Sequence, residues 1–312
     1  MKILVIGAGA LGSLVGGVLS RSHDVTILGR PEQADVLNEK GLQITGLTEG
    51  EYRPNAVSDY PRGTTFDLII ICVKSYNTEL VLDLISRDLS EGTYILSLQN
   101  GLDNEERIQR FLQSRSLPGK ILGGITCHGV IYKQPGIVKH AGIGDTFIGP
   151  YLIGPDVELD VREANRIADL FTDAGIDVVK TEAIRREIWA KTIINSAINP
   201  LTAIVGKTNG VIIEDPEMRK LAGALVDEGA LIAKAHGIEI GEKELLDRTL
   251  KVAERTKNNI SSMLQDIRRK RRTEIESING ALYRRAVEKG IRAPYNHSMY
   301  TLVMSLQSEY LR

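Results

Sequence analysis

The sequence predicts an α/β fold in which an N-terminal Rossmann-type domain with a parallel sheet precedes an all-helical C-terminal domain. Short β-rich runs alternate with helical or polar segments of βαβ length through the first half of the chain. A glycine-rich turn directly follows the first run, and strand signals largely stop after Thr181. At 312 residues the chain is also too long for one ordinary core. We therefore expect two domains, residues 1–181 and residues 182–312.

The expected strands are short runs rich in β-branched and apolar residues, which pack well on a pleated surface. The turn Gln134-Pro135-Gly136 separates two further runs and predicts a hairpin, so we expect an antiparallel extension of the sheet there. Asp160–Ala174 has a helical pattern and precedes a last strand, Ile176–Val179. The other expected strands are Lys2–Ile6, Asp24–Leu28, Phe66–Val73, Thr93–Leu98, Lys120–Ile125, His128–Val130, Ile137–His140 and Thr146–Ile148.

The C-terminal part lacks strand signals and predicts helices only. Gly237 and Gly290 fall where two of these helices should stop, because glycine readily adopts the left-handed conformation that ends a helix. The expected helices are Ile184–Val205, Pro216–His236, Lys243–Lys257, Glu274–Lys289 and Asn296–Tyr310.

Composition argues against several classes of function. The 39 basic and 40 acidic residues leave a net charge of −1, so no overall field attracts nucleic acid or an anionic membrane. No apolar run approaches the roughly 20 residues that span a bilayer, and a strand begins at the N-terminus without room for a signal peptide. Cys72 and Cys127 are far apart and the histidines lack metal-type spacing, so no metal site is expected. A cytoplasmic protein that binds a small molecule fits these features best.

The strongest motif is a cofactor fingerprint near the N-terminus. Strand Lys2–Ile6 leads into Gly7-Ala8-Gly9-Ala10-Leu11-Gly12, and a helix-compatible run follows. In such a motif Gly7 permits a tight turn, Gly9 lets the backbone approach a pyrophosphate, and Gly12 allows the helix to pack closely on the strand. The motif predicts dinucleotide binding, and a glycine-rich turn without a ligand is the alternative.

Arg30 indicates which dinucleotide is bound. It follows the second expected strand, where an NAD enzyme usually carries an acidic residue for the ribose hydroxyls. A guanidinium there can pair with the 2′-phosphate of NADP and stack on adenine. We therefore expect NADPH; NAD remains an alternative, because Glu32 lies nearby and Arg30 would then be an ordinary surface residue. Lys74 and Asn100 follow expected strands at the edge where parallel sheets bind ligands, with loop capping as an equal alternative for each.

Lys191, Asn195 and Asn199 recur every fourth residue in an otherwise apolar helical stretch, so one helix face carries an ammonium and two amides. Each polar group left unpaired in a dry interior would cost roughly 1–3 kcal/mol, so something polar must meet this face. A substrate is our first expectation for the three together. Backbone carbonyls or bound water are the alternative.

A second polar segment is expected near that face. Thr273 and Glu276 have the form of a capping box, so we predict that a helix begins at Thr273 and that Glu274 lies in its first turn. The start of a new helix lets the preceding loop fold back and bring Ser262 near Glu274. As an alternative, Ser262 is itself an N-cap, with Gln265 three residues later.

With these motifs in this order, the chain resembles the ketopantoate reductases (2-dehydropantoate 2-reductases) over essentially its full length. The resemblance implies the 6-phosphogluconate dehydrogenase-like arrangement of a Rossmann-type domain followed by a helical domain. It also implies NADPH-dependent reduction of 2-dehydropantoate to (R)-pantoate, on the pathway to pantothenate and coenzyme A. Its most specific stretches are Lys191–Pro200, Ser261–Asp266 and Thr273–Gly280.

The resemblance also implies roles for single residues. Lys191 is similar to the catalytic lysine of the family and Glu274 to its acidic companion. Asn77 stands where related proteins often have glutamine, so it receives no role, and the match of Asn209 is looser than the others. The positions similar to substrate-binding residues are Asn100, Lys191, Asn195, Asn199, Asn209, Asn259 and Ser262; those similar to cofactor-binding residues are Gly7, Ala8, Gly9, Ala10, Leu11, Gly12, Arg30, Lys74, Asn100 and Glu274.

The chemistry expected of these residues is the protonation of an alkoxide. A hydride that adds to C2 of a 2-keto acid leaves negative charge on the ketone oxygen, which the Lys191 ammonium can stabilise by a hydrogen bond and then protonate. Glu274 can orient that ammonium or accept a hydrogen bond from a substrate hydroxyl. Two other functions stay open, a related reductase of another 2-keto or 3-hydroxy acid and a dinucleotide-sensing regulator without chemistry. A homodimer is compatible with the sequence.

Overall fold

The computed structural model describes residues 1–152 and 157–311. The chain forms two compact units. The first contains Met1–Gln99 and Asn104–Ile184, and the second contains Asn100–Asp103 and Arg185–Arg312. The short segment Asn100–Asp103 therefore belongs with the helical unit, although the sequence on both of its sides belongs to the sheet unit.

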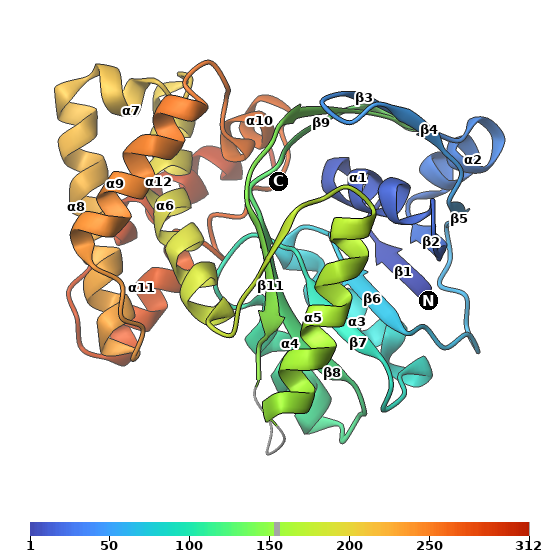
Figure 1. Cartoon of the computed structure of the whole chain (residues 1–312). Helices are drawn as coiled ribbons and strands as arrows, with labels where there is room; N and C mark the ends of the chain where they lie inside the picture. Colours follow the sequence, from blue (N-terminus) through green and yellow to red (C-terminus); the bar gives the residue numbers. More distant parts are fainter. Residues whose placement is uncertain (153–156, 312) are drawn as a thin grey trace. The chain divides into compact units, whose positions relative to one another are not determined.

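The first unit is built on an eight-stranded sheet. In chain order its strands are β1 (Lys2–Ile6), β2 (Asp24–Leu28), β5 (Asn55–Val57), β6 (Leu68–Ile71), β7 (Tyr94–Ser97), β8 (Lys120–Thr126), β11 (Thr146–Pro150) and β12 (Val178–Lys180). The order across the sheet is β12-β11-β8-β7-β6-β1-β2-β5 (Figure 1). The six strands from β8 to β5 pair in parallel, β11 runs antiparallel to β8, and β12 is parallel to β11. The parallel sheet confirms the sequence prediction, and β11 agrees with the strand expected at Thr146–Ile148.

Helices cover this sheet, as the alternation of the sequence predicts. The helix that follows the glycine-rich turn, α1 (Ala10–Leu19), contacts both β1 and β2, and α5 (Val157–Asp173) packs on β11 and β12 (Figure 1). The other helices of the first unit are α2 (Pro31–Lys40), α3 (Thr78–Ile85) and α4 (Asn104–Ser114), with single 3-10 turns η1 (Ser75–Asn77) and η2 (Ser86–Asp88).

A second, four-stranded sheet was not predicted. It consists of β3 (Leu42–Gly46), β4 (Gly50–Tyr52), β9 (Gly129–Gln134) and β10 (Ile137–Gly142), in the order β4-β3-β10-β9. The hairpin expected at Gln134-Pro135-Gly136 is present as β9 and β10, but β10 pairs in parallel with β3 instead of extending the main sheet. The expected place of this hairpin is therefore wrong. The second sheet covers α1, and a Cβ on Gly17 of that helix would lie only 2.7 Å from Leu42 Cδ2.

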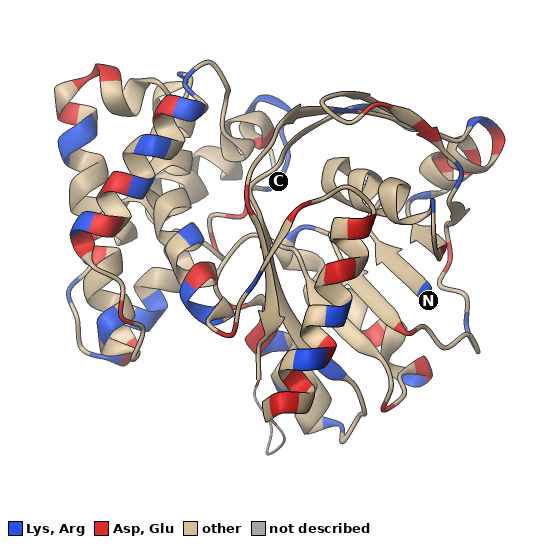
Figure 2. Ribbon diagram, in the orientation of Figure 1, with Lys and Arg blue, Asp and Glu red and all other residues tan. Residues whose placement is uncertain are grey.

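The regular elements of the second unit, within its described residues, are helices, in agreement with the prediction. They are α6 (Ile184–Val205), α7 (Val211–Glu214), α8 (Pro216–Ala235), α9 (Glu242–Arg255), α10 (Ser262–Arg268), α11 (Asn279–Glu288) and α12 (Pro294–Ser308). Acidic and basic residues are interspersed along α8 and α9, as they are along α5 (Figure 2). Among residues 1–152 and 157–311, none of the helices has the length and apolar character needed to cross a bilayer.

The helix predicted to begin at Thr273 is wrong in its start. Residues 274–278 form a turn, and α11 begins at Asn279. Ile278, and not Thr273, is the N-cap of α11. The Thr273 hydroxyl accepts from the Ile275 N–H at 3.4 Å, and the hydroxyl and the backbone N–H of Thr273 donate to Gln307 Oε1 at 2.8 and 2.9 Å. Glu274 therefore lies in a turn and not in the first turn of a helix.

Candidate functional site

The glycine-rich turn has the geometry that dinucleotide binding requires. Gly7 has φ +113°, a value that favours glycine, and a Cβ on Gly12 would lie 1.9 Å from the Gly7 carbonyl oxygen. These two glycines are therefore needed by the protein itself. A Cβ on Gly9 would meet no described atom within 4 Å, so packing within the protein does not require glycine at this position. Approach of a ligand phosphate to the backbone is a reason for glycine here.

The N-terminus of α1 supplies the matching electrostatics. Gly9 is the N-cap of this ten-residue helix, and no described side chain caps it or places an acidic group in its first turn. The first N–H groups of a helix lack partners within the helix and carry partial positive charge. Ala10 and Leu11 begin this turn, so their backbone presents these donors beside Gly9. The residues present thus fit a pyrophosphate.

Arg30 lies next to this turn. The residue that holds it there was not identified from the sequence. Arg30 is the N-cap of α2 and its side chain is exposed. The Gln33 amide links the two segments, because Nε2 donates to the Ala8 carbonyl at 2.7 Å while Oε1 accepts from the Arg30 N–H at 3.0 Å. Gln33 Nε2 also lies 3.0 Å from the Tyr132 hydroxyl on β9. The backbone of Arg30 is therefore anchored beside the glycine-rich turn.

Lys74 lies at the end of the β6 strand, as predicted. It is half-buried and precedes η1, where the Asn77 N–H donates to the Lys74 carbonyl at 2.9 Å. Gln99 at the end of β7 donates through Nε2 to the Val73 carbonyl at 2.9 Å, so the ends of β6 and β7 are tied together. Lys74 is thus placed at the carboxyl edge of the sheet, where parallel sheets bind ligands.

The helix α6 carries the three polar residues singled out by their spacing, and its bounds agree with the predicted ones. Lys191 and Asn195 are half-buried, whereas Asn199 is only 7% exposed. Spacing by four places all three on one helix face. Buried aliphatic side chains, among them Ile193 and Ala197, occupy the other faces. The face that carries Lys191, Asn195 and Asn199 is therefore flanked by buried aliphatic side chains.

Glu274 and Asn100, which are far apart in the sequence, are in contact within the second unit. Asn100 Nδ2 donates to Glu274 Oε2 at 3.0 Å, and Glu274 is only 5% exposed. The backbone reinforces this contact, since the Leu102 N–H donates to the Ser277 carbonyl at 3.0 Å. A Cβ on Gly101 would lie 2.6 Å from the same carbonyl oxygen, so the segment approaches the turn too closely for any other residue. The Glu274 carboxylate and the turn that carries it are thus held by the 100–102 segment, which is distant in the sequence.

Asn209 and Asn259 form a neighbouring pair. The Asn209 N–H donates to the Asn259 carbonyl at 2.9 Å, and Asn209 Nδ2 donates to Thr256 Oγ1 at the same distance. Asn209 is 7% exposed, whereas the Asn259 side chain is exposed. The structure therefore brings these two predicted residues together through the backbone of the 256–259 segment.

Ser262 is exposed and is the first residue of α10, so the alternative role predicted for it, an N-cap, is wrong by one residue. Ser261 is the cap, and its Oγ accepts from the Leu264 N–H at 3.1 Å. Ser261 Oγ also lies 2.8 Å from Thr202 Oγ1, three residues after Asn199 on α6. The cap therefore attaches the start of α10 to the helix with the polar face.

A small apolar core packs these pieces together. It joins α6, α10, the 274–278 turn and α12 through Ala203, Met263, Leu264, Ile275, Ile278 and Val303. The polar face of α6, the start of α10 and the turn that carries Glu274 are therefore parts of one packed body. The residue types of this unit, an ammonium, a carboxylate and several amides, are those that bind a small polar molecule.

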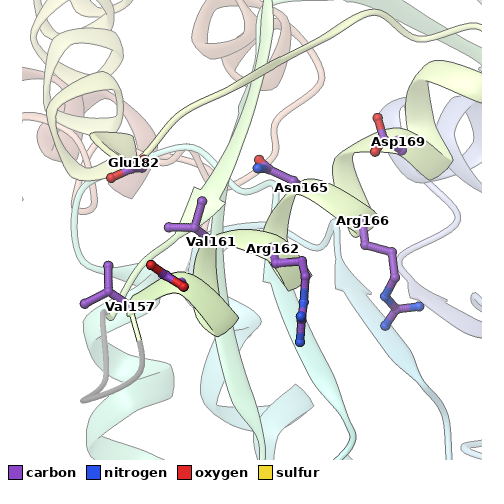
Figure 3. A pocket seen from close by; sticks show the side chains of 8 residues that line it. Val157, Val161, Arg162, Asn165, Arg166, Asp169 and Glu182 are labelled. Atoms are coloured by element: carbon purple, nitrogen blue, oxygen red, sulfur yellow. The ribbon is translucent and has the colours of Figure 1, made fainter.

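A surface pocket of about 770 Å³ is a separate feature. It lies along α5 in the first unit, and Val157, Arg162, Asn165, Arg166 and Asp169 are among the residues that line it (Figure 3). None of the predicted site residues lines this pocket. Groups of three or more His, Cys, Asp or Glu that could hold a metal ion are absent from the described part of the chain.

Comparison with known proteins gives consistent results. Residues 3–152 match the family model described as "Ketopantoate reductase PanE/ApbA", and residues 183–307 match "Ketopantoate reductase PanE/ApbA C terminal". A 2-dehydropantoate 2-reductase of Pyrococcus horikoshii is 41% identical over 311 residues, which cover 99% of this chain and 98% of that protein. A ketopantoate reductase structure from Ralstonia eutropha JMP134 has a TM-score of 0.88 at 28% identity and full coverage of both chains. A structure of D-mandelate dehydrogenase with NADH and anilino(oxo)acetate has a TM-score of 0.90 at 27% identity and covers 99% of each chain.

Proposed function

The chain belongs to the ketopantoate reductase family, and we propose that it catalyses the NADPH-dependent reduction of ketopantoate to (R)-pantoate, a step of pantothenate biosynthesis. The observation that carries the proposal is the face of α6 with Lys191, Asn195 and Asn199, on a helix whose C-terminal part packs in one small core with the turn of the buried Glu274. This set combines a proton donor, a carboxylate and hydrogen-bonding groups for a polar substrate. A dinucleotide-sensing regulator would have no use for it.

The first unit would hold the cofactor. The backbone at Gly9 and the N-terminus of α1 accept the pyrophosphate, and the Arg30 guanidinium pairs with the 2′-phosphate. Lys74 at the edge of the sheet adds a further cationic contact. When bound, the reduced nicotinamide supplies the hydride that adds to C2 of the substrate. The charge of Arg30 favours NADPH over NADH.

Lys191 acts as the general acid. Its ammonium donates a hydrogen bond to the ketone oxygen of the substrate, and this bond strengthens as negative charge develops on that oxygen. The proton then moves from Nζ to the alkoxide and completes the hydroxyl group. Because Lys191 is half-buried rather than fully enclosed, the neutral amine can recover a proton from solvent after turnover.

Glu274 supports this proton transfer. Its carboxylate can orient the Lys191 ammonium or accept a hydrogen bond from a substrate hydroxyl. The bond from Asn100 Nδ2 fixes one carboxylate oxygen and sets the direction of the other. Asn195 and Asn199 hydrogen-bond the polar groups of ketopantoate, including the hydroxymethyl group that simpler 2-keto acids lack.

Reduction of another 2-keto acid is the second candidate. It is favoured by the likeness to D-mandelate dehydrogenase, whose substrate carries an aryl group in place of a hydroxylated chain. The two candidates differ in what the α6 face must meet, since an aryl ring offers no hydrogen-bonding partner to Asn195 and Asn199.

The test is a substrate panel with the purified protein, followed by nicotinamide absorbance. Ketopantoate, 2-ketoisovalerate and phenylglyoxylate are compared at several concentrations, each with NADPH and with NADH. We expect the highest kcat/KM for ketopantoate with NADPH. A higher kcat/KM for phenylglyoxylate supports the second candidate, and a protein that binds NADPH but reduces none of the three contradicts both.

A further inference from the structure

Pro200 interrupts the hydrogen bonding of α6 within the stretch that carries the proposed substrate residues. The helix continues from Ile184 to Val205 through this proline. A proline has no N–H, so the carbonyl of the residue four positions earlier, Ser196, loses its partner within the helix. Ser196 follows Asn195, and Pro200 follows Asn199. Asn199 therefore lies within the interrupted turn, whereas Lys191 and Asn195 precede it.

Asn279 supplies the missing donor. Its Nδ2 donates to the Ser196 carbonyl at 3.0 Å, and neither Asn279 nor Ser196 is exposed to solvent. Asn279 is the first residue of α11 and lies five positions after Glu274. One side chain thus connects the interrupted part of α6 to the segment that holds the proposed carboxylate.

A buried chain of hydrogen bonds orients the Asn279 amide. Its Nδ2 also donates to Asn296 Oδ1 at 3.1 Å. Asn296 Nδ2 in turn donates to Glu228 Oε2 at 2.9 Å, and this bond leaves Oδ1 of Asn296 to face Asn279. Glu228 accepts in addition from the backbone N–H groups of Tyr295 and Asn296, both at 2.8 Å, at the start of α12. The carboxylate on α8 therefore determines which way each amide points.

We propose that Asn279 is a positioning residue of the substrate site, which holds α6 at the carbonyl released by Pro200 and so aligns Asn199 with Lys191 and Asn195. It touches neither the substrate nor the cofactor, and it acts through the backbone of α6. The proposal rests on the proposed function, because the alignment matters only if this face binds the substrate. It predicts that the role of Asn279 depends on the proline.

The experiment is a double-mutant cycle of Asn279→Ala and Pro200→Ala, in the full-length protein. Pro200→Ala restores an N–H that can bond the Ser196 carbonyl within the helix, so Asn279 is no longer needed there. Thr249→Val is the matched control, because Thr249 is also fully buried and its Oγ1 donates to the Leu245 carbonyl at 2.8 Å on α9. For each variant we measure kcat and KM for ketopantoate, Kd for NADPH and Tm.

We expect Asn279→Ala to lower kcat/KM for ketopantoate by about 10- to 100-fold, as small misplacements of positioning groups do, with an unchanged Kd for NADPH. Thr249→Val should lower Tm but keep wild-type kcat/KM. In the Pro200→Ala background, Asn279→Ala should cause little further loss of kcat/KM. Should Asn279→Ala fail to fold, Asn279→Ser, which keeps one donor, enters the same cycle, with a smaller loss expected.

Two results would overturn the proposal. One is a loss of kcat/KM on Asn279→Ala no larger than on Thr249→Val, which would make Asn279 a stabilising residue only. The other is an equal loss in the proline and alanine backgrounds. A failure of the proposed function is separate, because it appears already in the wild-type substrate panel, and the cycle can then use whichever keto acid is reduced best.

Discussion

Substitutions in the glycine-rich turn can distinguish effects on ligand binding from effects on folding, because two of its glycines are needed for different reasons. At Gly12 an added Cβ would overlap the Gly7 carbonyl at 1.9 Å, and a backbone atom cannot move aside as a side chain can. Overpacking of this kind costs typically about 1–3 kcal/mol and occasionally more. We therefore expect Gly12→Ala to lower Tm clearly, whether or not cofactor is present.

Gly9→Ala should have the opposite profile. Gly9 has φ −81° and ψ −166°, which alanine adopts without strain, and its Cβ would meet no described atom within 4 Å. The cost to the free protein is limited to the weaker N-cap preference of alanine, about 1 kcal/mol or less. The new methyl group would stand where the backbone meets the pyrophosphate, so the Kd for NADPH should rise at least about tenfold, which corresponds to roughly 1.4 kcal/mol.

The assay combines thermal unfolding without ligand and fluorescence titration with NADPH for wild type, Gly9→Ala and Gly12→Ala. The expected pattern is a nearly normal Tm with weak binding for Gly9→Ala, and a low Tm for Gly12→Ala. Normal NADPH binding by Gly9→Ala would refute the claim that this turn holds the pyrophosphate. A normal Tm for Gly12→Ala would refute the packing argument.

Three further predictions concern other parts of the molecule. Lys191→Ala should lower kcat by about 10²–10⁴-fold with intact NADPH binding, because it removes the positioned proton donor, and a near-normal kcat would move that role to another group. Arg30→Ala should weaken NADPH much more than NADH in fluorescence titrations, by about 1.5–3 kcal/mol for the lost charge-assisted contact, whereas equal losses would leave the 2′-phosphate without this partner. Burial lowers the pKa of both His128 and His140, which share a 2.8 Å contact, below the ordinary 6.5, so the unfolded chain binds more protons and the free energy of unfolding should fall as pH drops through that value. Urea midpoints above and below pH 6.5 measure this slope, and a His128→Asn/His140→Gln double variant that keeps the full slope would assign it to other groups.

Local patterns predicted most of the fold because its main elements have strong local signals. Continuous apolar runs such as Leu68–Ile71 belong to strands buried on both faces, and the bounds of α6 followed from apolar spacing alone. The short strands β3 and β4 were missed because they are stabilised by a distant partner. Ile137 on β10 pairs with Gln43 on β3, and a local sequence pattern does not predict a pairing between such distant residues.

The errors in the second unit have the same cause. Thr273 and Glu276 satisfy the pattern of a capping box, but the Thr273 hydroxyl donates to Gln307, 34 residues away, and the helix begins only at Asn279. Ser261 rather than Ser262 caps α10, and its Oγ also accepts a hydrogen bond from Thr202 on α6. Tertiary contacts here override sequence signals that are correct in isolation.

The sequence identified candidate site residues that have charged or amide side chains in a recognisable spacing. It did not identify residues whose side chains bond a distant backbone carbonyl. Spacing alone singled out Lys191 and the α6 asparagines, and their roles remain predictions. Gln33 and Asn279 were not predicted, because each bonds a carbonyl from a distant segment. Pro200 was the available signal for Asn279, since a proline inside a helix requires a donor from elsewhere.

The most direct test of the central claim, that the α6 face binds the hydroxyl group of ketopantoate, is the ratio of kcat/KM for ketopantoate to that for 2-ketoisovalerate. The two acids differ by one hydroxymethyl group, and a site built to hydrogen-bond a hydroxyl can reject the analogue that lacks it by about 10⁴-fold or more. We expect a ratio of this order for the wild type with NADPH. Asn199→Ala should reduce the ratio by damaging the ketopantoate reaction alone. Similar kcat/KM values for both acids in the wild type would contradict the account.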